Sequence, residues 1–489
     1  MEKTKATAKA PSSRLNLPTR SSIVFTLSGI ASKGASLLLT PIFTRLLSPS
    51  EYGTYSLFNS YLSVLTVLAT LEIGGSVVLR AFQRYRGREY TVILTASLII
   101  FPTAILVLLG FAILRRASGG GSIFFGAYPM LFISVVSSGI INLVTARAKF
   151  LYKPKIAVFL SLITGVAAPV LAIFLISADA PFSYSRVVIK VASTSLALLL
   201  CTVCLAWRIA SRARRELSSL TVGERYALIK ECAFLLLRLS LPLLPYYFSV
   251  MAISQADKLA VSRYLGASAL GGYSVAYSTG LAPICISQGL ICALTPWVMR
   301  KVRSGNFQAV RKALGSVFSI LCALSALFLA VVPEAFAFLA PAEYRAALPV
   351  TFIIALSPLP LFLMNIESSV ICAYERTLPT VLTGAAVSVL SVCTTYLLTS
   401  RLGYVASAAC VISAYVTVAT VQAINIRRIT GHTIADPKLC LRAFLLTATL
   451  SLGMLALRES LGARLTLALL PLASLIYMLS KARELLRDK

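Results

Sequence analysis

Apolar runs recur along nearly the whole chain, each about twenty residues long, which is enough for a helix to cross a hydrocarbon core about 30 Å thick. Backbone groups in lipid must be hydrogen-bonded within the protein, so such runs form helices. Only 13% of the residues are charged, whereas a soluble domain carries about 25%. The sequence therefore predicts an all-α membrane protein that crosses the bilayer many times.

The chain carries a formal net charge of +29. A nucleic-acid-binding protein gathers its Lys and Arg in a patch on a folded soluble domain. Here the basic residues lie between the apolar runs, mostly in alternate gaps. Cytoplasmic loops of membrane proteins carry such an excess of Lys and Arg. The charge therefore indicates membrane topology, with both chain ends in the cytoplasm and no nucleic-acid partner.

An even number of spans follows from this topology. We expect about fourteen, and twelve remains open because one hairpin fewer leaves both ends on the same side. The expected spans are 21–44, 55–79, 91–114, 122–146, 156–177, 187–207, 231–253, 269–297, 313–333, 347–372, 378–398, 403–425, 439–457 and 464–480. They define a basic N-terminus (1–20), a first six-helix lobe (21–207), a cytoplasmic linker (208–230), a second six-helix lobe (231–425), a cytoplasmic loop (426–438), two C-terminal spans (439–480) and a tail (481–489).

A short repeat relates the two expected lobes. Residues 44–56 (TRLLSPSEYGTYS) align without gaps on residues 262–274 (SRYLGASALGGYS), and six of the thirteen positions are identical. Both segments follow the first span of a six-span group, so they face the same side of the membrane. The repeat predicts two lobes related by a pseudo-two-fold axis along the membrane normal, a plan that recurs among transporters.

No catalytic signature is visible in the sequence, which lacks a P-loop, an HExxH motif and a nucleotide fingerprint. The ten cysteines are scattered, and Cys201 and Cys204 form a CxxC inside an apolar run with no second pair. Small buried residues explain this pattern better than a metal site does. We expect a transporter rather than an enzyme, with no cofactor and with H⁺ or Na⁺ as open candidates for a coupling ion.

Six segments together resemble the polysaccharide transport flippases of the multidrug/oligosaccharidyl-lipid/polysaccharide exporter superfamily. Their order and spacing along most of the chain carry the resemblance, since no single segment is a signature. One departure is Ala-Ser-Ala at 406–408, where the family usually has Gly-Ala-Ala. The segments are TPIFTRLLSPSEYGTYSLF (40–58), LRLSLPLLP (237–245), SRYLGASALGGYSVAY (262–277), LTPWVMRKVRSG (294–305), APAEYRAALPV (340–350) and LGYVASAACVISAY (402–415).

The resemblance implies a two-lobed twelve-span core with two added C-terminal spans in a bacterial inner membrane. It implies alternating access, which moves a polyprenyl-diphosphate-linked oligosaccharide to the outer leaflet for O-antigen, capsule or exopolysaccharide synthesis. Membrane lipids surround such a protein, and a polysaccharide polymerase and a chain-length regulator are candidate partners. A multidrug/cation antiporter and a lipid II flippase of the same superfamily stay open. A glycan polymerase or ligase also stays open, although such enzymes usually have a large external loop.

Ionisable residues within the spans are the candidates for substrate binding, because a charge in the bilayer costs about 2.5–3.5 kcal/mol on insertion scales. Lys33 and Arg238 are candidate diphosphate ligands, with ion pairing of Lys33 to Glu72 and snorkelling of Arg238 as the alternatives. Glu72 and Glu367 are candidates for a coupling-ion site, a sugar contact or a counter-ion. The weaker polar candidates are Asn365 and Gln288.

Three charged residues near the external ends of spans are gate candidates. Arg45 and Arg263 occupy equivalent positions of the repeat, where a structural role at the helix ends is the alternative. Asp257 is the third, with a solvated loop charge as the alternative. Prolines within the spans predict kinks, because proline removes a backbone hydrogen bond; they include Pro102, Pro242, Pro283 and Pro296.

Overall fold

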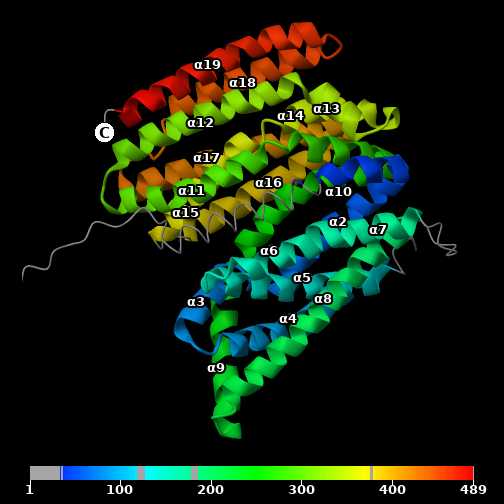
Figure 1. The fold of residues 1–489 in the computed structure, drawn as a ribbon, viewed down its shortest axis with the longest axis vertical. Helices are drawn as coiled ribbons and strands as arrows, with labels where there is room; N and C mark the ends of the chain where they lie inside the picture. The colour runs from blue at the N-terminus through cyan, green and yellow to red at the C-terminus, as the bar shows by residue number, and fades with distance from the viewer. Residues whose placement is uncertain (1–33, 35–36, 118–126, 178–185, 375–377, 488–489) are drawn as a thin grey trace, which may run out of the picture.

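The computed structural model describes residues 34, 37–117, 127–177, 186–374 and 378–487 (Figure 1). These residues contain helices and connecting turns, and no strand occurs among them. Nine of the described helices are long and apolar enough to cross a membrane, or up to eleven when each of two bent pairs counts as one span. The predicted all-α membrane fold is confirmed. Most of the first expected span, 21–44, lies outside the described residues.

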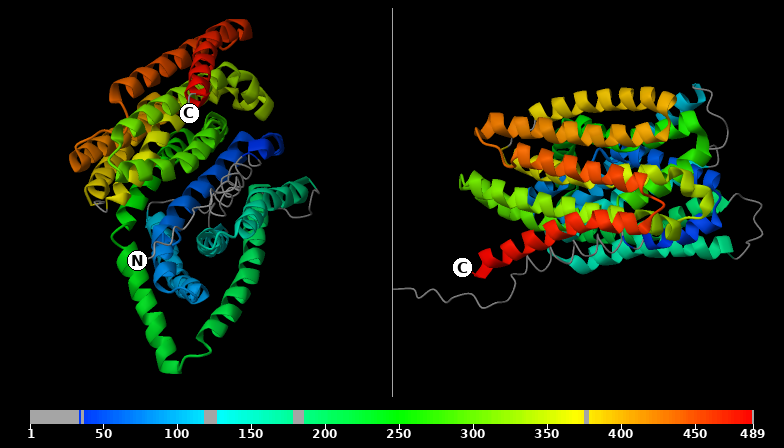
Figure 2. Two further views of the ribbon diagram at one scale, coloured as in Figure 1. Left: turned by 60° about the vertical axis from the view of Figure 1, so that its left-hand side comes forward. Right: turned by 90° about the horizontal axis from the view of Figure 1, so that it is seen from above.

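The helices lie roughly parallel when the molecule is seen from above (Figure 2). In chain order they are α2 (Pro49–Thr70), α3 (Ser76–Arg84), α4 (Glu89–Ala117), α5 (Tyr128–Phe150), α6 (Pro154–Leu162), α7 (Ala168–Ser177), α8 (Arg186–Leu217), α9 (Val222–Ser240), α10 (Leu244–Gly280), α11 (Ile284–Arg303), α12 (Phe307–Ala330), α13 (Val332–Leu339), α14 (Leu348–Ile354), α15 (Pro358–Ala373), α16 (Leu378–Leu402), α17 (Tyr404–Thr430), α18 (Pro437–Ala456) and α19 (Leu461–Arg487).

Two groups of helices form separate lobes (Figure 1). The first lobe contains α2–α9, and one of its cores includes Ile73, Phe82 and Leu236. The second lobe contains α10–α17, and its cores include Leu314 and Phe362. Helices α18 and α19 pack on α12 at the far side of the second lobe. Each lobe thus has apolar cores of its own, and Tyr52 and Leu57 of α2 also pack against a core of the second lobe.

The connection between the lobes differs from the expected linker at 208–230. Helix α8 continues to Leu217, and α9 begins after Thr221, whose side chain forms a capping box with Glu224. The two helices meet in a V (Figure 2). Helix α9 packs on α3 and α4, where Cys232 joins the first-lobe core. The chain therefore crosses to the second lobe at 241–243, inside the expected seventh span.

Within the described residues, four of the expected spans are interrupted by turns of at least three residues, at 71–75, 241–243, 281–283 and 355–357. Two of these breaks contain prolines, Pro242 and Pro283, for which the sequence predicts kinks, and the chain bends by 46° at the second of them. Pro102 and Pro296 instead lie inside continuous helices, α4 and α11. The break at 71–75 contains no proline and was not expected.

The two copies of the repeat contact each other where the lobes meet. A Cβ atom added to Gly53 of α2 would lie 1.8 Å from the Ala267 carbonyl oxygen, and one added to Gly271 of α10 would lie 1.9 Å from the Pro49 oxygen. Three residues further along, the hydroxyl oxygens of Ser56 and Ser274 are 2.6 Å apart. Residues on a two-fold axis contact their own equivalents. The crossing of α2 and α10 at Gly53, Ser56, Gly271 and Ser274 therefore agrees with the predicted pseudo-symmetry.

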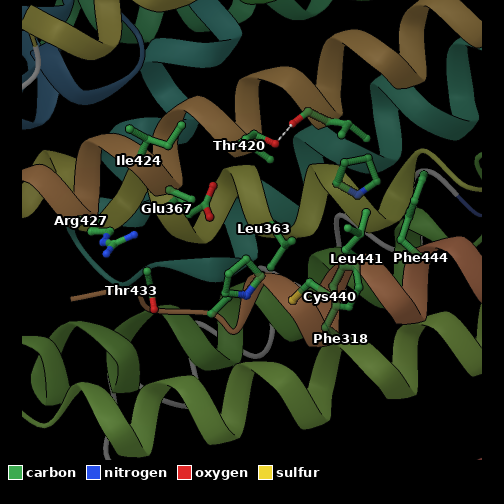
Figure 3. Close-up of a pocket in the computed structure, with 16 residues that line it drawn as sticks. Phe318, Leu363, Glu367, Thr420, Ile424, Arg427, Thr433, Cys440, Leu441 and Phe444 are labelled. Carbon is green, nitrogen blue, oxygen red and sulfur yellow. Dashed lines mark hydrogen bonds between the residues drawn. The ribbon is translucent and has the colours of Figure 1, made fainter.

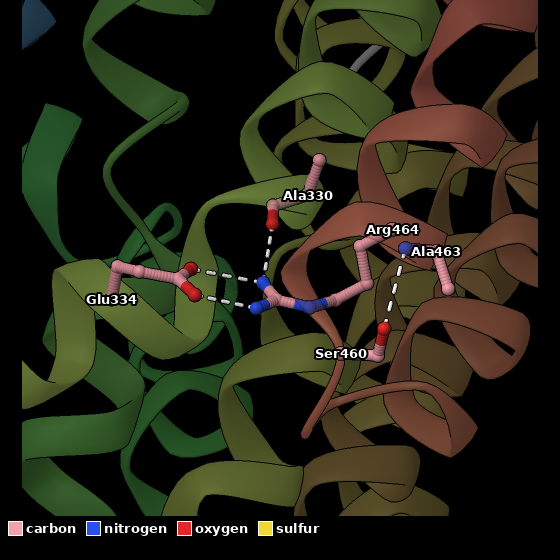
Figure 4. A network of polar contacts seen from close by, with 5 residues as sticks. All are labelled: Ala330, Glu334, Ser460, Ala463 and Arg464. Atoms are coloured by element: carbon pink, nitrogen blue, oxygen red, sulfur yellow. Dashed lines mark hydrogen bonds and ion pairs between the residues drawn. The ribbon is translucent and has the colours of Figure 1, made fainter.

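The C-terminal pair of helices is fixed to the second lobe by a buried arginine (Figure 4). The Arg464 guanidinium of α19 donates two hydrogen bonds to the Glu334 carboxylate of α13, one of them at 2.9 Å, and another to the Ala330 carbonyl. The Arg464 side chain is 1% exposed and that of Glu334 is 48% exposed. The ion pair attaches α19 to α13, and the hydrogen bond to Ala330 attaches it to the end of α12.

Candidate functional site

The break between α2 and α3 has an unusual backbone. Leu71 (φ 49°) and Glu72 (φ 48°) both adopt left-handed conformations, which cost about 1–3 kcal/mol each for residues other than glycine. Leu71 and Ile73 are buried in the first-lobe core. Because these neighbours hold the turn from one side, the Glu72 side chain is directed to the other side, into a pocket.

This pocket has a volume of about 270 Å³ and a lining that is about half polar and half apolar. Besides Glu72 it is lined by Asn142, Thr145 and Lys149 of α5, which lie on one face of that helix because their spacing is three and four residues. A Cβ atom added to Gly75 would lie 3.7 Å from both a Glu72 carboxylate oxygen and the Tyr247 hydroxyl. Tyr247 belongs to α10, so the pocket adjoins the second lobe.

Glu367 lies in a different pocket, within the C-terminal half of the chain (Figure 3). Its side chain is 2% exposed, and Oε2 has no hydrogen-bond partner. This pocket, about 260 Å³ in volume, lies among α12, α15, α17 and α18, and apolar side chains such as Phe318 and Phe444 make up most of its lining. The structure therefore does not bring Glu367 together with Glu72.

Asp257 is fully buried within α10, so its alternative as a solvated loop charge is wrong. The Tyr273 hydroxyl donates a hydrogen bond of 2.6 Å to Asp257 Oδ2, and the Lys258 ammonium lies 4.5 Å from the centre of the Tyr277 ring. The loop assignment failed because α10 continues to Gly266, whose φ of 84° marks the turn.

Lys190 of α8 is a buried charge in the first lobe, with 3% of its surface exposed. Its ammonium nitrogen lies 3.5 Å from the centre of the Phe43 ring and 3.6 Å from that of Tyr55, positions that allow cation–π attraction. Tyr55 and Tyr273 are equivalent residues of the repeat. Each therefore contacts the buried charge of its own lobe, a cation in the first and a carboxyl group in the second.

Four hydrogen bonds join the lobes at the end of the molecule where α2 begins. The Thr44 hydroxyl donates to the Leu339 carbonyl at 2.7 Å, and the Arg45 guanidinium donates to the Phe338 carbonyl at 3.4 Å. The Tyr344 hydroxyl donates to the Leu47 carbonyl at 2.9 Å, and the two serines of the crossing form the fourth bond. Arg45 thus bridges the lobes at this end, and its role as a gate stays a prediction.

The remaining candidates lie apart from the pocket at the α2–α3 break. Arg238 is exposed on α9, and Arg263 is exposed near the turn of α10. Gln288 is half-buried on α11, and Asn365 donates a hydrogen bond to the Leu361 carbonyl of its own helix at 2.7 Å. Lys33 lies outside the described residues.

Sequence reasoning did not select Asn142, Thr145 or Lys149. A partial signal was available, because these residues are spaced by three and four positions, but Lys149 lies beyond the expected span 122–146, beside Arg147. They became candidates only when the structure placed Glu72 opposite them. Lys190 is visible as a charge within a span, but its aromatic neighbours come from two distant segments of the sequence.

The architecture is similar to that of several solved transporters. The lipid II flippase MurJ in an inward closed conformation aligns with a TM-score of 0.64 at 14% identity, covering 95% of this chain and 100% of that one. An inward-facing multidrug resistance MATE transporter of the MOP superfamily gives 0.60 at 15% identity, covering 84% and 98%. A MOP superfamily transporter from Pyrococcus furiosus gives 0.55 at 15% identity, covering 86% and 99%.

These likenesses define the fold, which the chain shares with solved transporters of the MOP superfamily. No curated protein sequence matches the chain. The family model described as "Polysaccharide biosynthesis protein" matches residues 19–302, more than half of the chain. The chain belongs to this family of polysaccharide biosynthesis proteins, and it is a multi-pass membrane protein.

Proposed function

We propose that the protein moves a polyprenyl-diphosphate-linked oligosaccharide from the cytoplasmic to the outer leaflet of a bacterial inner membrane. The family match carries this proposal, since residues 19–302 include the whole first lobe with its polar pocket. Surface polysaccharides are assembled from polar sugars, which do not cross a hydrocarbon layer unaided. A membrane protein of such a family therefore has a transport task that fits its fold.

The junction of the lobes supports alternating access. Small residues and four hydrogen bonds close the molecule where α2 begins, and the charge distribution assigns this end to the outside. Such contacts exchange with water at little net cost. In the proposed cycle this end separates after loading from the cytoplasm. Lys33 and Arg238 bind the diphosphate, and the polar groups between the lobes bind the glycan or a coupling ion.

Complementation of a flippase-null bacterial strain tests the proposal. We expect the wild-type gene to restore surface polysaccharide, and Lys33→Ala, expressed at the same level, to leave the lipid-linked repeat unit on the cytoplasmic side. Sidedness is measured by labelling the glycan from outside the intact inner membrane. Full activity of the variant would remove Lys33 from the mechanism. Absence of rescue across several sugar backgrounds, together with gained drug resistance, would favour a multidrug antiporter.

A further inference from the structure

The pocket at the α2–α3 break combines four kinds of polar group. Its lining includes a carboxylate (Glu72), an amide (Asn142), a hydroxyl (Thr145) and an ammonium (Lys149). Asn142 and Lys149 are exposed and the other two are half-buried. Lys149 lies in the last turn of α5, at the end of the pocket, whereas Glu72, Asn142 and Thr145 face open space among predominantly apolar helices. Polar groups in such a place are costly unless a ligand or water satisfies them.

The strained turn fixes the carboxylate in position. Glu72 sits between two buried residues, Leu71 and Ile73, and has a left-handed backbone that residues other than glycine rarely adopt. Such outliers persist where the surrounding structure enforces them, and they cluster at binding sites. The start of α3 also lies beside this carboxylate, and the positive end of a helix stabilises a nearby negative charge. Glu72 is thus held as an acceptor directed into the pocket.

The chemistry of the lining distinguishes between ligand classes. An apolar drug needs a mainly apolar pocket, which describes the Glu367 pocket and not this one. A diphosphate needs several cations or uncompensated helix N-termini. Here a single lysine lines the pocket together with a carboxylate, whose negative charge would repel a diphosphate. A sugar ring presents several hydroxyl groups, each both donor and acceptor, and such a mixed lining satisfies them.

The geometry points to this pocket as a saccharide-binding subsite, in which Glu72 accepts hydrogen bonds from sugar hydroxyls and Asn142, Thr145 and Lys149 complete the polar contacts. Its volume of about 270 Å³ greatly exceeds the 10–15 Å³ that one water needs, so it has room for one sugar ring. The ligand is a ring of the lipid-linked oligosaccharide, and this inference rests on the proposed function. The neighbouring Tyr247 of the second lobe places the subsite where relative movement of the lobes changes its access.

A comparison of two lipids tests the subsite. Purified full-length protein in lipid nanodiscs is titrated with polyprenyl diphosphate that carries the oligosaccharide, and separately with sugar-free polyprenyl diphosphate. We expect Glu72→Gln to weaken binding of the glycosylated lipid about tenfold or more, as for lost hydrogen bonds to a charged group, and Asn142→Ala to weaken it about two- to tenfold, as for a neutral hydrogen bond. Binding of the sugar-free lipid should stay unchanged. Glu459→Gln, an exposed carboxylate in the turn before α19, is the matched control.

Three other outcomes have distinct meanings. If Glu72→Gln weakened binding of both lipids equally, the pocket would bind the diphosphate or have only a structural role. This result would overturn the saccharide subsite. If Glu72→Gln and Asn142→Ala bound the glycosylated lipid as tightly as the wild type, the saccharide subsite would also be overturned. Failure of the wild type to bind either lipid would refute the proposed function itself. Thermal unfolding of each variant shows that a lost affinity is not lost folding.

Discussion

Replacing Gly53 by alanine should lower the transport rate about fivefold or more although both lobes stay folded. The new methyl group would lie 1.8 Å from the Ala267 oxygen and 2.9 Å from the Gly271 nitrogen, and backbone atoms cannot rotate away as a side chain does. Helices α2 and α10 must therefore move apart, which breaks the 2.6 Å contact between Ser56 and Ser274. Overpacking of this kind costs about 1–3 kcal/mol, which corresponds to a shift of about 5- to 150-fold against the closed state.

The chain supplies matched variants for this prediction. Gly271→Ala should have the same effect as Gly53→Ala, because its methyl group would meet the Pro49 oxygen at 1.9 Å. Gly110→Ala in α4 adds a methyl group with no atom within 4 Å, so it should leave transport unchanged. Rates are measured with lipid-linked oligosaccharide in proteoliposomes. Wild-type rates for both Gly53→Ala and Gly271→Ala would show that the crossing does not govern transport.

Removing one partner of the Arg464–Glu334 ion pair should have unequal effects. Glu334→Ala leaves a guanidinium that is 1% exposed without its carboxylate, and a buried charged donor without its partner costs about 1–3 kcal/mol or more. Arg464→Met removes the buried charge itself, and the remaining carboxylate, 48% exposed, can be hydrated. We therefore expect Glu334→Ala to lower the temperature of unfolding more than Arg464→Met does.

The pH dependence of this pair has a definite sign. Hydrogen bonds from Arg464 lower the pKa of the Glu334 carboxyl group below its usual value. A group with a lowered pKa stabilises the folded state above its unfolded pKa, and this stabilisation disappears as pH falls through the folded value. The difference in unfolding temperature between the wild type and Glu334→Ala should therefore shrink in acid. If Arg464→Met lowered the unfolding temperature as much as Glu334→Ala or more, the account of the pair would be contradicted.

The sequence was sufficient to predict the class of fold and the repeat, because both depend on patterns within single segments. Long apolar runs have no other stable form in lipid, and six identities at a constant spacing revealed the repeat. That the two copies contact each other was seen only in the structure. The breaks at Pro242 and Pro283 were also predictable, since proline removes a helical hydrogen bond. The number of spans is harder to predict, because a span that is broken by a turn consists of two helices, each shorter than a full crossing.

The candidate site was predictable only in part. Glu72 was identified as a charge within a span, but its turn has no proline, and its left-handed backbone depends on burial of Leu71 and Ile73. Glu367 looked equivalent in the sequence, yet helix packing places it beside α18 in an apolar pocket. Asp257 was assigned to a helix end because the continuation of α10 to Gly266 is not visible in hydropathy. Tertiary packing determined each of these differences.

Cysteines placed at the crossing would show whether the lobes must separate there during transport. Ser56→Cys with Ser274→Cys, in a variant whose ten native cysteines are replaced, joins α2 to α10 at positions whose hydroxyl oxygens are 2.6 Å apart. Ser134→Cys with Ser195→Cys is the matched control, because these oxygens are 2.9 Å apart on α5 and α8 of the same lobe.

The measurement is transport of the lipid-linked oligosaccharide in proteoliposomes before oxidation, after oxidation and after reduction. The alternating-access account predicts that oxidation cross-links both pairs but stops transport only in the Ser56/Ser274 variant. A reductant should then restore transport. Full transport by protein that is cross-linked between Ser56→Cys and Ser274→Cys would contradict the account, because the lobes would then not separate at this end.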